Sequence, residues 1–254
     1  MIRYLIVSLL ILLSGCIHRP EPVWTEIPTA QELLDGVSAN AVRYTSLDTA
    51  ASVSLRSGFK YFPSQQFILL KKPDHLRTDV LNSFGLLLFQ LASDGETLSV
   101  FMNTTVPGRF FRGPASYESL YRFTKVPLAA KDLLALLLYG PPQIVHQKAT
   151  IRVAAKKLTL TLSGSDNSRQ ELLFDRNYRL IGCRYFTGKK KYLDVVYQKF
   201  SAENQFPQKI TILMPREKLR VKLEFSELKI NTAIDPARFS LKTHPNLPIE
   251  GFPQ

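Results

Sequence analysis

The sequence predicts a mainly β fold with added helices (α+β). We expect a strongly curved antiparallel sheet, or unclosed β-barrel, with an N-terminal helix and a helical lid. Short runs of alternating apolar and polar residues recur along the chain, separated by turn signals such as Ser57-Gly58 and Ser93-Asp94-Gly95. Two segments of helical periodicity interrupt them. The 254 residues are 45% hydrophobic and 21% charged, which suits one sizeable globular domain.

The chain begins with the layout of a secretory signal peptide, which we assign to residues 1–15. Arg3 supplies a positive start, the apolar run 5–13 follows, and Ser14 and Gly15 lead to Cys16. The run is too short for the roughly 20 residues of a membrane-spanning helix. Leu-Ser-Gly-Cys resembles the lipobox of bacterial lipoproteins, which implies cleavage before Cys16 and acylation of its thiol and new amino group. An ordinary signal peptide with an incidental cysteine is the alternative.

Residues 16–28 are rich in proline and polar residues and are expected to form a flexible tether, followed by one domain over residues 29–254. The net charge is +12, because Lys and Arg number 33 against 21 Asp and Glu. Such an excess favours an anionic lipid surface. Nucleic acid is the rival partner for this charge. No zinc spacing, RNP-type motif or glycine-rich phosphate loop occurs, so we expect no nucleic-acid partner.

A helix is predicted at about residues 29–45. Thr29-Ala30-Gln31-Glu32 has the pattern of a capping box, in which a Thr side chain and a Glu carboxylate bind the free amides at a helix start. Leu33, Val37, Ala41 and Tyr44 then recur at helical spacing, giving one apolar face.

Strands are predicted in two series. The first includes Val53 with Leu55, Phe67 with Leu69, Leu76, and Leu98 with Val100. The second follows Gln147, at residues 151–153, 158–162, 171–174, 180–186, 192–197, 209–213 and 219–225. The regular spacing with intervening turns indicates a large antiparallel sheet that curves toward a barrel.

Between the two series, residues 115–142 have helical periodicity. Tyr117, Leu120 and Tyr121 fit one short helix. Residues 127–139 fit a second, with Pro127 in its first turn and Gly140 as its stop. Leucines cover more than one face of this second helix, so it must be buried on most sides. It is either a core helix packed across the sheet or a lid over an apolar ligand cavity.

No enzyme is expected, because the sequence contains no recognisable motif of catalytic residues. The four histidines are scattered without metal-ligand spacing, and no Ser or Cys motif of a nucleophile occurs. Cys183 follows Gly182 in a predicted strand and is expected to be a buried, inert thiol. We therefore expect no catalytic residue, no metal site and no cofactor other than covalent lipid on Cys16.

The order of these features resembles the LolA/LolB superfamily of outer-membrane lipoprotein-sorting proteins, and the lipobox makes it most similar to LolB. "LRTDVLNSFGLLLFQL", residues 76–91, is similar to the LolB stretch in which a strand leads into Asn-Pro-Leu-Gly and returns as the next strand. "LLALLLYGPP", residues 133–142, is similar to that family's helix ending in Leu-Gly-x-Pro. The resemblance covers nearly the whole mature chain in layout.

The resemblance implies a membrane-anchored chaperone that binds the acyl chains of lipoproteins in an apolar cavity and helps to insert them into the outer membrane. Its implied partners are acylated lipoproteins, a periplasmic LolA-like carrier and the membrane lipid around its anchor, and we expect a monomer. Ile17, directly after the lipidated cysteine, is compatible with an outer-membrane position facing the periplasm. An envelope scaffold lipoprotein on the same fold, with a filled interior, is the alternative.

Two groups of residues receive a role from the resemblance. Phe84, in Asn82-Ser83-Phe84-Gly85, would take the part of the LolB leucine on a protruding loop that pushes cargo into the membrane. The other reading of Phe84 is a core residue beside a tight turn. If alternation holds, the cavity and lid are formed by Phe67, Leu69, Leu87, Phe89, Leu98, Val100, Leu134, Leu137 and Leu138. Each of these could equally be plain core.

Overall fold

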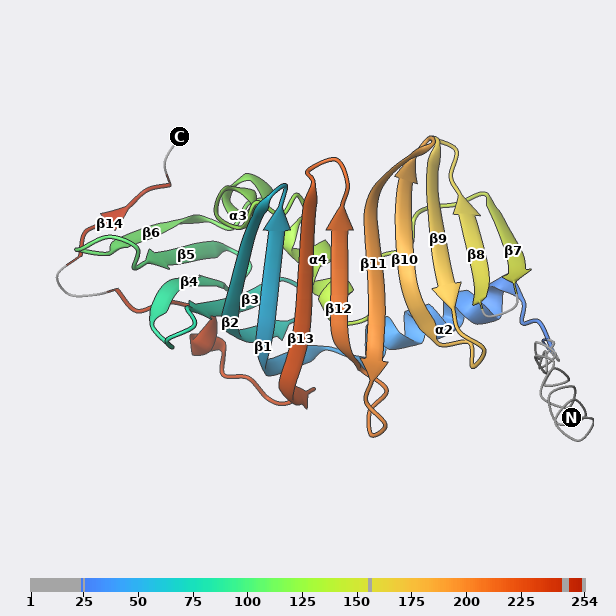
Figure 1. Cartoon of the computed structure of the whole chain (residues 1–254), viewed down its shortest axis with the longest axis horizontal. Helices are drawn as coiled ribbons and strands as arrows, with labels where there is room; N and C mark the ends of the chain where they lie inside the picture. The colour runs from blue at the N-terminus through green and yellow to red at the C-terminus, as the bar shows by residue number, and fades with distance from the viewer. Residues whose placement is uncertain (1–23, 25, 155–156, 244–246, 253–254) are drawn as a thin grey trace, which may run out of the picture.

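The structure is a computed structural model, and it describes residues 24, 26–154, 157–243 and 247–252. The described strands form one strongly curved, unclosed sheet of 14 strands, in the order β14-β6-β5-β4-β3-β2-β1-β13-β12-β11-β10-β9-β8-β7 (Figure 1). Neighbouring strands are antiparallel, except that β14 runs parallel to β6. This architecture confirms the predicted fold class.

The strands come in the two series that the alternation predicts. The first comprises β1 (Ser46–Ser57), β2 (Lys60–Lys71), β3 (His75–Leu81), β4 (Leu87–Ser93), β5 (Thr97–Met102) and β6 (Arg109–Pro114). The second comprises β7 (Lys148–Ala154), β8 (Lys157–Ser163), β9 (Ser168–Phe174), β10 (Leu180–Thr187), β11 (Lys190–Phe200), β12 (Pro207–Met214) and β13 (Leu219–Ile230). β6 and the two-residue β14 (Ile249–Glu250) were not expected.

The last long strand joins the two series into one sheet. β13 returns to pair with β1 over almost its whole length, with Val53 opposite Leu223. Because β1 also pairs with β2, the first strand of the chain lies inside the sheet instead of at its edge. One large apolar cluster therefore extends over both series, from Val53 and Leu91 to Leu160 and Leu223.

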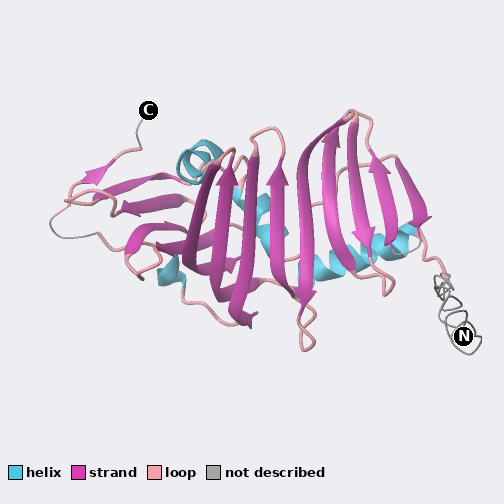
Figure 2. Cartoon of the chain, viewed as in Figure 1, coloured by secondary structure: helices cyan, strands magenta, loops and turns pink. Residues whose placement is uncertain are grey.

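The helices α2 (Ala30–Arg43), α3 (Tyr117–Thr124) and α4 (Ala130–Leu137) lie on one face of the sheet (Figure 2). The capping box predicted for α2 is present. The backbone N–H of Thr29 donates to Oε2 of Glu32 at 2.7 Å, and the backbone N–H of Glu32 donates to Oγ1 of Thr29 at 3.2 Å. Leu33 and Val37 are buried beneath the helix, as the spacing predicts.

α4 is shorter than the predicted span 127–139. The backbone N–H of Leu128 donates to the carbonyl of Val126 at 2.9 Å, so the chain turns there and Pro127 precedes the helix. The N-cap is Ala129. At the other end Tyr139, and not Gly140, takes the left-handed conformation that stops the helix, with a φ of 57°.

Gly140 has a different role, the close approach of two backbones. A Cβ atom at this position would lie 2.6 Å from Cα of Ala41 and 2.8 Å from its Cβ, inside α2. The absence of a side chain thus lets the end of α4 contact α2.

Gly140→Ala is expected to lower the free energy of unfolding by about 1 to 3 kcal/mol, because the added methyl group forces the two backbones apart. Urea unfolding followed by circular dichroism measures the change. The matched control is Gly36→Ala in α2, where a Cβ meets no atom within 4 Å and helix propensity favours alanine by about 1 kcal/mol. Equal stability of Gly140→Ala and the wild type would contradict the close-approach role.

The C-terminal segment covers part of the outer face of the sheet, opposite the helices. Its 3-10 turn η1 (Pro236–Phe239) brings Phe239 into a small cluster with Leu69 and Ile234. Leu241 packs with Ala92, Phe101 and Phe110 in a second cluster. Strands β2 to β6 are therefore covered on both faces over part of their length.

The anchor region is only partly described. The predicted signal peptide, residues 1–15, and the lipidated Cys16 lie outside the described residues. Trp24, within the span expected to be a tether, already contacts the domain, since its Nε1 donates to the carbonyl of Ala154 at 3.0 Å and its ring lies 5.8 Å from that of Tyr178. Among residues 24 and 26–252 that are described, no helix combines the length and apolar character needed to cross a membrane.

Candidate functional site: an apolar cavity between the sheet and the helices

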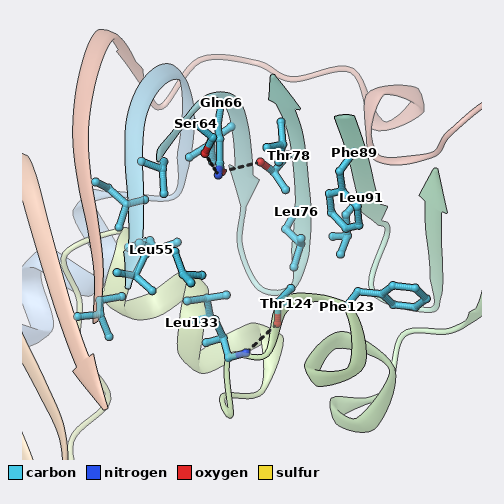
Figure 3. A pocket seen from close by; sticks show the side chains of 18 of the residues that line it. Leu55, Ser64, Gln66, Leu76, Thr78, Phe89, Leu91, Phe123, Thr124 and Leu133 are labelled. Carbon is cyan, nitrogen blue, oxygen red and sulfur yellow. Dashed lines mark hydrogen bonds between the residues drawn. The ribbon is translucent and has the colours of Figure 1, made fainter. Parts of the chain in front are cut away.

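A cavity of about 490 Å³ lies between the inner face of the sheet and helices α3 and α4 (Figure 3). Such a volume falls within the roughly 300–1,000 Å³ of small-molecule sites. The deep part is lined by buried leucines that include Leu76, Leu91, Leu120 and Leu134. Tyr61 and Phe62 also line the cavity and are more than half exposed, so the mouth lies beside them, near the β1–β2 turn.

The inner faces of β2 and β3 form one wall. On β2 the lining side chains alternate as Ser64, Gln66, Ile68 and Leu70, and on β3 as Leu76, Thr78 and Val80. The register places Thr78 opposite Ile68 and Val80 opposite Gln66. This is the period of two that a strand imposes, because successive side chains point to opposite faces of a sheet.

Three polar side chains, Ser64, Gln66 and Thr78, form a hydrogen-bonded polar belt in this wall. Nε2 of Gln66 donates to Oγ of Ser64 at 3.0 Å, and Oγ1 of Thr78 donates to Oε1 of Gln66 at 3.0 Å. Figure 3 shows the polar belt on the side of the cavity opposite Leu133 of α4. All three residues are half-buried.

α4 forms the opposite wall, and it is held in place. Leu133, Leu134 and Leu137 line the cavity, whereas Leu136 and Leu138 are buried in the core behind it. Hydrogen bonds from buried side chains then fasten the end of the helix to the sheet.

Three buried tyrosines and one glutamine make these bonds. The hydroxyl of Tyr197 donates to the carbonyl of Leu136 at 3.0 Å, that of Tyr139 to Leu180 at 2.7 Å, and that of Tyr185 to Pro142 at 2.6 Å. Gln170, fully buried, donates to the carbonyl of Pro142 at 2.9 Å and accepts from the N–H of Ile144 at 3.0 Å. Burial raises the pKa of all three tyrosines well above the usual value, so the hydroxyls stay protonated and able to donate. α4 thus forms a wall of the cavity opposite the polar belt, and its end is bonded to the sheet.

Of the residues predicted to form the cavity, Phe89, Leu134 and Leu137 line it. Leu98, Val100 and Leu138 are buried in the main core and do not reach the cavity. Leu87 packs against the second cluster, under the C-terminal segment. The prediction for these four residues was wrong in detail, since they belong to packed core beside the cavity.

Phe67 and Leu69 face the opposite way from the prediction. Phe67 is 55% exposed on the outer face, and Leu69 is buried there against Ile234 and Phe239. Their neighbours Ile68 and Leu70 line the cavity in their place. The run Phe67-Ile68-Leu69-Leu70 is apolar on both faces, and the C-terminal segment covers Leu69 on the outer side, so alternation in the sequence does not reveal which residues point inward.

Phe84 projects from the β3–β4 turn and is 89% exposed, so it is not a core residue. Oδ1 of Asn82 accepts from the backbone N–H groups of Phe84 and Leu86, at 2.9 and 3.0 Å, and organises the turn. Gly85 has a φ of 79°, a conformation that favours glycine. The turn therefore holds an aromatic ring in water at a defined place.

Other turns at the same end of the strands also expose apolar side chains. Phe59 in the β1–β2 turn and Val106 in the β5–β6 turn are fully exposed. The backbone N–H of Asn103 donates to the carbonyl of Leu88 at 2.9 Å, which places the β5–β6 turn next to the β3–β4 turn. An isolated apolar residue between turn-forming neighbours, as in Gly58-Phe59-Lys60, is the signal by which the sequence could have revealed them.

Among the described residues that line the cavity, no cluster of titratable groups occurs. In the part of the chain that the structure describes, no three residues among His, Cys, Asp and Glu are placed to hold a metal ion. Cys183 is free and buried in the sheet, as predicted, and burial raises the pKa of its thiol far above the usual value.

Comparison with known proteins relates the fold, though not the sequence, to solved structures. A LolA superfamily protein from Nitrosomonas europaea is similar with a TM-score of 0.53 and 16% identity, over 85% of this chain and 99% of that chain. A putative outer membrane lipoprotein-sorting protein domain from Vibrio parahaemolyticus has a TM-score of 0.53 and 12% identity, over 83% of this chain and 97% of that chain. A DUF1329 family protein from Desulfovibrio piger has a TM-score of 0.54 and 13% identity, over 83% of this chain and 95% of that chain.

No model of a protein family matches the chain, and no curated protein matches its sequence. The similarity to solved structures extends over most of each chain, so the protein has a LolA/LolB-like fold, as the order of its sequence features predicts.

Proposed function

We propose that the protein is a membrane-anchored lipoprotein chaperone that binds the acyl chains of lipoproteins in the cavity and helps to insert them into the outer membrane. The observation that carries this proposal is the cavity itself, about 490 Å³ of unfilled space lined by leucine side chains. A protein interior is normally close-packed, with few voids larger than a water molecule. A scaffold lipoprotein with a filled interior has no use for such a space.

The LolA/LolB-like fold supports the same proposal. Solved structures with this fold include a putative lipoprotein-sorting domain, and the cavity here lies between the curved sheet and its helices. Lipid on Cys16 would hold the chain at the periplasmic face of the outer membrane, and a periplasmic LolA-like carrier would deliver its cargo. Each cargo methylene buried among the leucines contributes about 0.8 kcal/mol.

Cross-linking to acylated cargo tests this function. The full-length chain is held in lipid nanodiscs and mixed with a triacylated lipopeptide that carries a diazirine in one acyl tail. On illumination we expect cross-links to peptides containing Leu76, Leu91 or Leu133, all of which line the cavity. Cross-links spread evenly over the outer face, with none in these peptides, would contradict acyl-chain binding in the cavity.

Thiol titration tests the lipid anchor independently. The chain has two cysteines, and acylation of Cys16 would leave Cys183 as the one free thiol. We expect no reaction with a disulfide reagent in the folded protein at pH 8, because burial raises the pKa of the Cys183 thiol, and one reactive thiol per chain in denaturant. Two reactive thiols in denaturant would rule out acylation of Cys16. Rapid reaction without denaturant would contradict the burial of Cys183.

Phe84 receives the role of membrane insertion within this proposal. Its exposure at the tip of an ordered turn supports the role, because an aromatic side chain gains free energy on leaving water for the membrane interface. Phe59 and Val106, exposed in turns at the same end of the strands, would contact the same membrane.

A further inference from the structure

The polar belt stands out because it interrupts a mostly apolar cavity. Ser64, Gln66 and Thr78 occupy inward positions on β2 and β3, where leucine, isoleucine or valine would complete the apolar wall. Polar groups placed in an apolar pocket fix the orientation of a ligand and provide specificity. The position, charge and free hydrogen-bonding groups of the polar belt then define the chemistry that it recognises.

The polar belt lies between the mouth and the deep part of the cavity. Along β2, exposed Tyr61 and Phe62 come first, Ser64 and Gln66 are half-buried, and Ile68 and Leu70 are buried. On β3, Thr78 is half-buried and Leu76 is buried below it. A ligand that enters with its hydrocarbon tail first would therefore place its head group, or the linkage next to it, at the polar belt.

The polar belt carries no charge. Among the described residues that line the cavity, Arg77 is the only charged one, and its guanidinium is occupied. Nε and Nη2 of Arg77 each donate to a carboxylate oxygen of Asp79 at 3.0 Å, and Nη1 donates to the carbonyl of Arg238 at 3.2 Å. A carboxylate or phosphate at the polar belt would lose its hydration without gaining a cation, which costs far more free energy than burying a neutral polar group.

The polar belt retains free hydrogen-bonding groups. A side-chain amide has two N–H donors, and Gln66 uses one of them on Ser64. The hydroxyl of Ser64 accepts that bond, and its own proton remains available. These donors match a carbonyl oxygen, the acceptor that esters and amides present.

We propose that the polar belt binds the uncharged ester or amide carbonyl of an acylated ligand while the hydrocarbon tail fills the cavity below. The cavity then selects esterified or amide-linked acyl chains over free fatty acids and over plain hydrocarbon. This inference rests on the proposed function, in which the cavity holds acyl chains, and it adds the chemical class that the site recognises.

Three photoreactive probes with identical tails test the inference. They are a palmitoyl methyl ester, the free palmitic acid and the corresponding hydrocarbon, each with a diazirine at the same carbon. The full-length chain in lipid nanodiscs is illuminated with each probe, and the label on cavity peptides is quantified by mass spectrometry. Each probe partitions into the lipid to its own extent, but that extent is the same for every variant. Comparing variants with the same probe therefore removes the contribution of partitioning.

We expect the ratio of labelling by the ester to labelling by the hydrocarbon at cavity peptides to be roughly fivefold to tenfold higher in the wild type than in Gln66→Leu, the size of about one neutral hydrogen bond. Gln66→Leu is expected to remove this preference while labelling by the hydrocarbon persists. Gln65→Leu is the matched control, because Gln65 is the neighbouring residue on β2 but is exposed on the outer face. Ser64→Ala, a smaller change in the same hydrogen-bonded chain, is expected to reduce the preference in part.

The outcomes separate the inference from the function on which it rests. If no probe labels the cavity peptides of the wild type, acyl-chain binding in the cavity is wrong, and the inference fails with it. If the probes label the cavity but the ester labels it no more than the hydrocarbon does, the polar belt does not bind the ester carbonyl. The same follows if Gln66→Leu keeps the preference for the ester. In both cases only the inference is overturned. Equal labelling by the free acid and the ester would likewise contradict selection by charge.

Discussion

Replacing Val80 by tryptophan is expected to lower acyl-chain binding by at least tenfold. Val80 points into the cavity from β3, with Gln66 opposite on β2 and Phe89 opposite on β4. The larger indole would occupy space that the acyl chain needs. Excluding only two methylenes of cargo costs about 1.6 kcal/mol, which is roughly fifteenfold in affinity. The measurement is the yield of cross-links between the diazirine lipopeptide and cavity peptides.

The matched control for this variant is Gln65→Trp. Gln65 is exposed on the neighbouring strand and points to the outer face, so the same side chain is added without filling the cavity. Strands accept aromatic residues well, and both variants are expected to fold, which circular dichroism and urea unfolding verify. A folded Val80→Trp protein that binds the lipopeptide as tightly as the wild type would show that the ligand lies elsewhere.

Phe84→Glu is expected to slow the transfer of acylated lipoprotein into liposomes by at least tenfold, with binding in the cavity unchanged. Burying a phenylalanine side chain contributes about 1.5 to 3 kcal/mol, equivalent to roughly 10-fold to 150-fold in partition, and a carboxylate forfeits that gain. Phe84 is 89% exposed on a turn ordered by Asn82, so its replacement removes no core packing. The transfer rate and the cross-link yield are measured on the same preparation.

Two further variants isolate the role of the aromatic ring. Phe84→Leu is expected to retain most of the transfer, because leucine is also favourable in the membrane interface. Val145→Glu places the same charge at another exposed apolar residue, in the loop before the edge strand β7, and is expected to leave transfer unchanged. Transfer by Phe84→Glu at the wild-type rate, or equal loss in Val145→Glu, would remove Phe84 from the membrane-insertion role.

Local patterns predicted the elements of this fold well, because each depends on neighbouring residues. The capping box at Thr29 and Glu32 starts α2, and the strands of the second series appear where alternation between turns places them. β6 escaped detection because its consecutive residues Phe110 and Phe111 are both buried and show no alternation, and the two-residue β14 is too short to show a period. β14 exists only because the C-terminal segment reaches the edge of the sheet beside β6.

Because local patterns report only on neighbouring residues, they also misplaced the two ends of α4. The sequence contains a proline and a glycine at the positions where helices commonly begin and end. Neither acts in that way, because Pro127 lies in a preceding turn and Gly140 allows contact with Ala41, about 100 residues earlier in the chain. The need for glycine at position 140 arises from the backbone of α2, which is distant in sequence, so no pattern of neighbouring residues reveals it.

The sequence by itself determined the strand and helix order, the curved antiparallel class and the apolar character of α4, because residue spacing and turn chemistry encode these locally. Only the tertiary structure decided which side of β2 faces the cavity and which residues of α4 line it. It also decided that Ser64, Gln66 and Thr78 meet in one polar belt. The physical reason is that inward and outward are defined by what covers each face. Here the helices cover one face and the C-terminal segment covers part of the other, so β2 buries apolar residues on both faces at Ile68, Leu69 and Leu70.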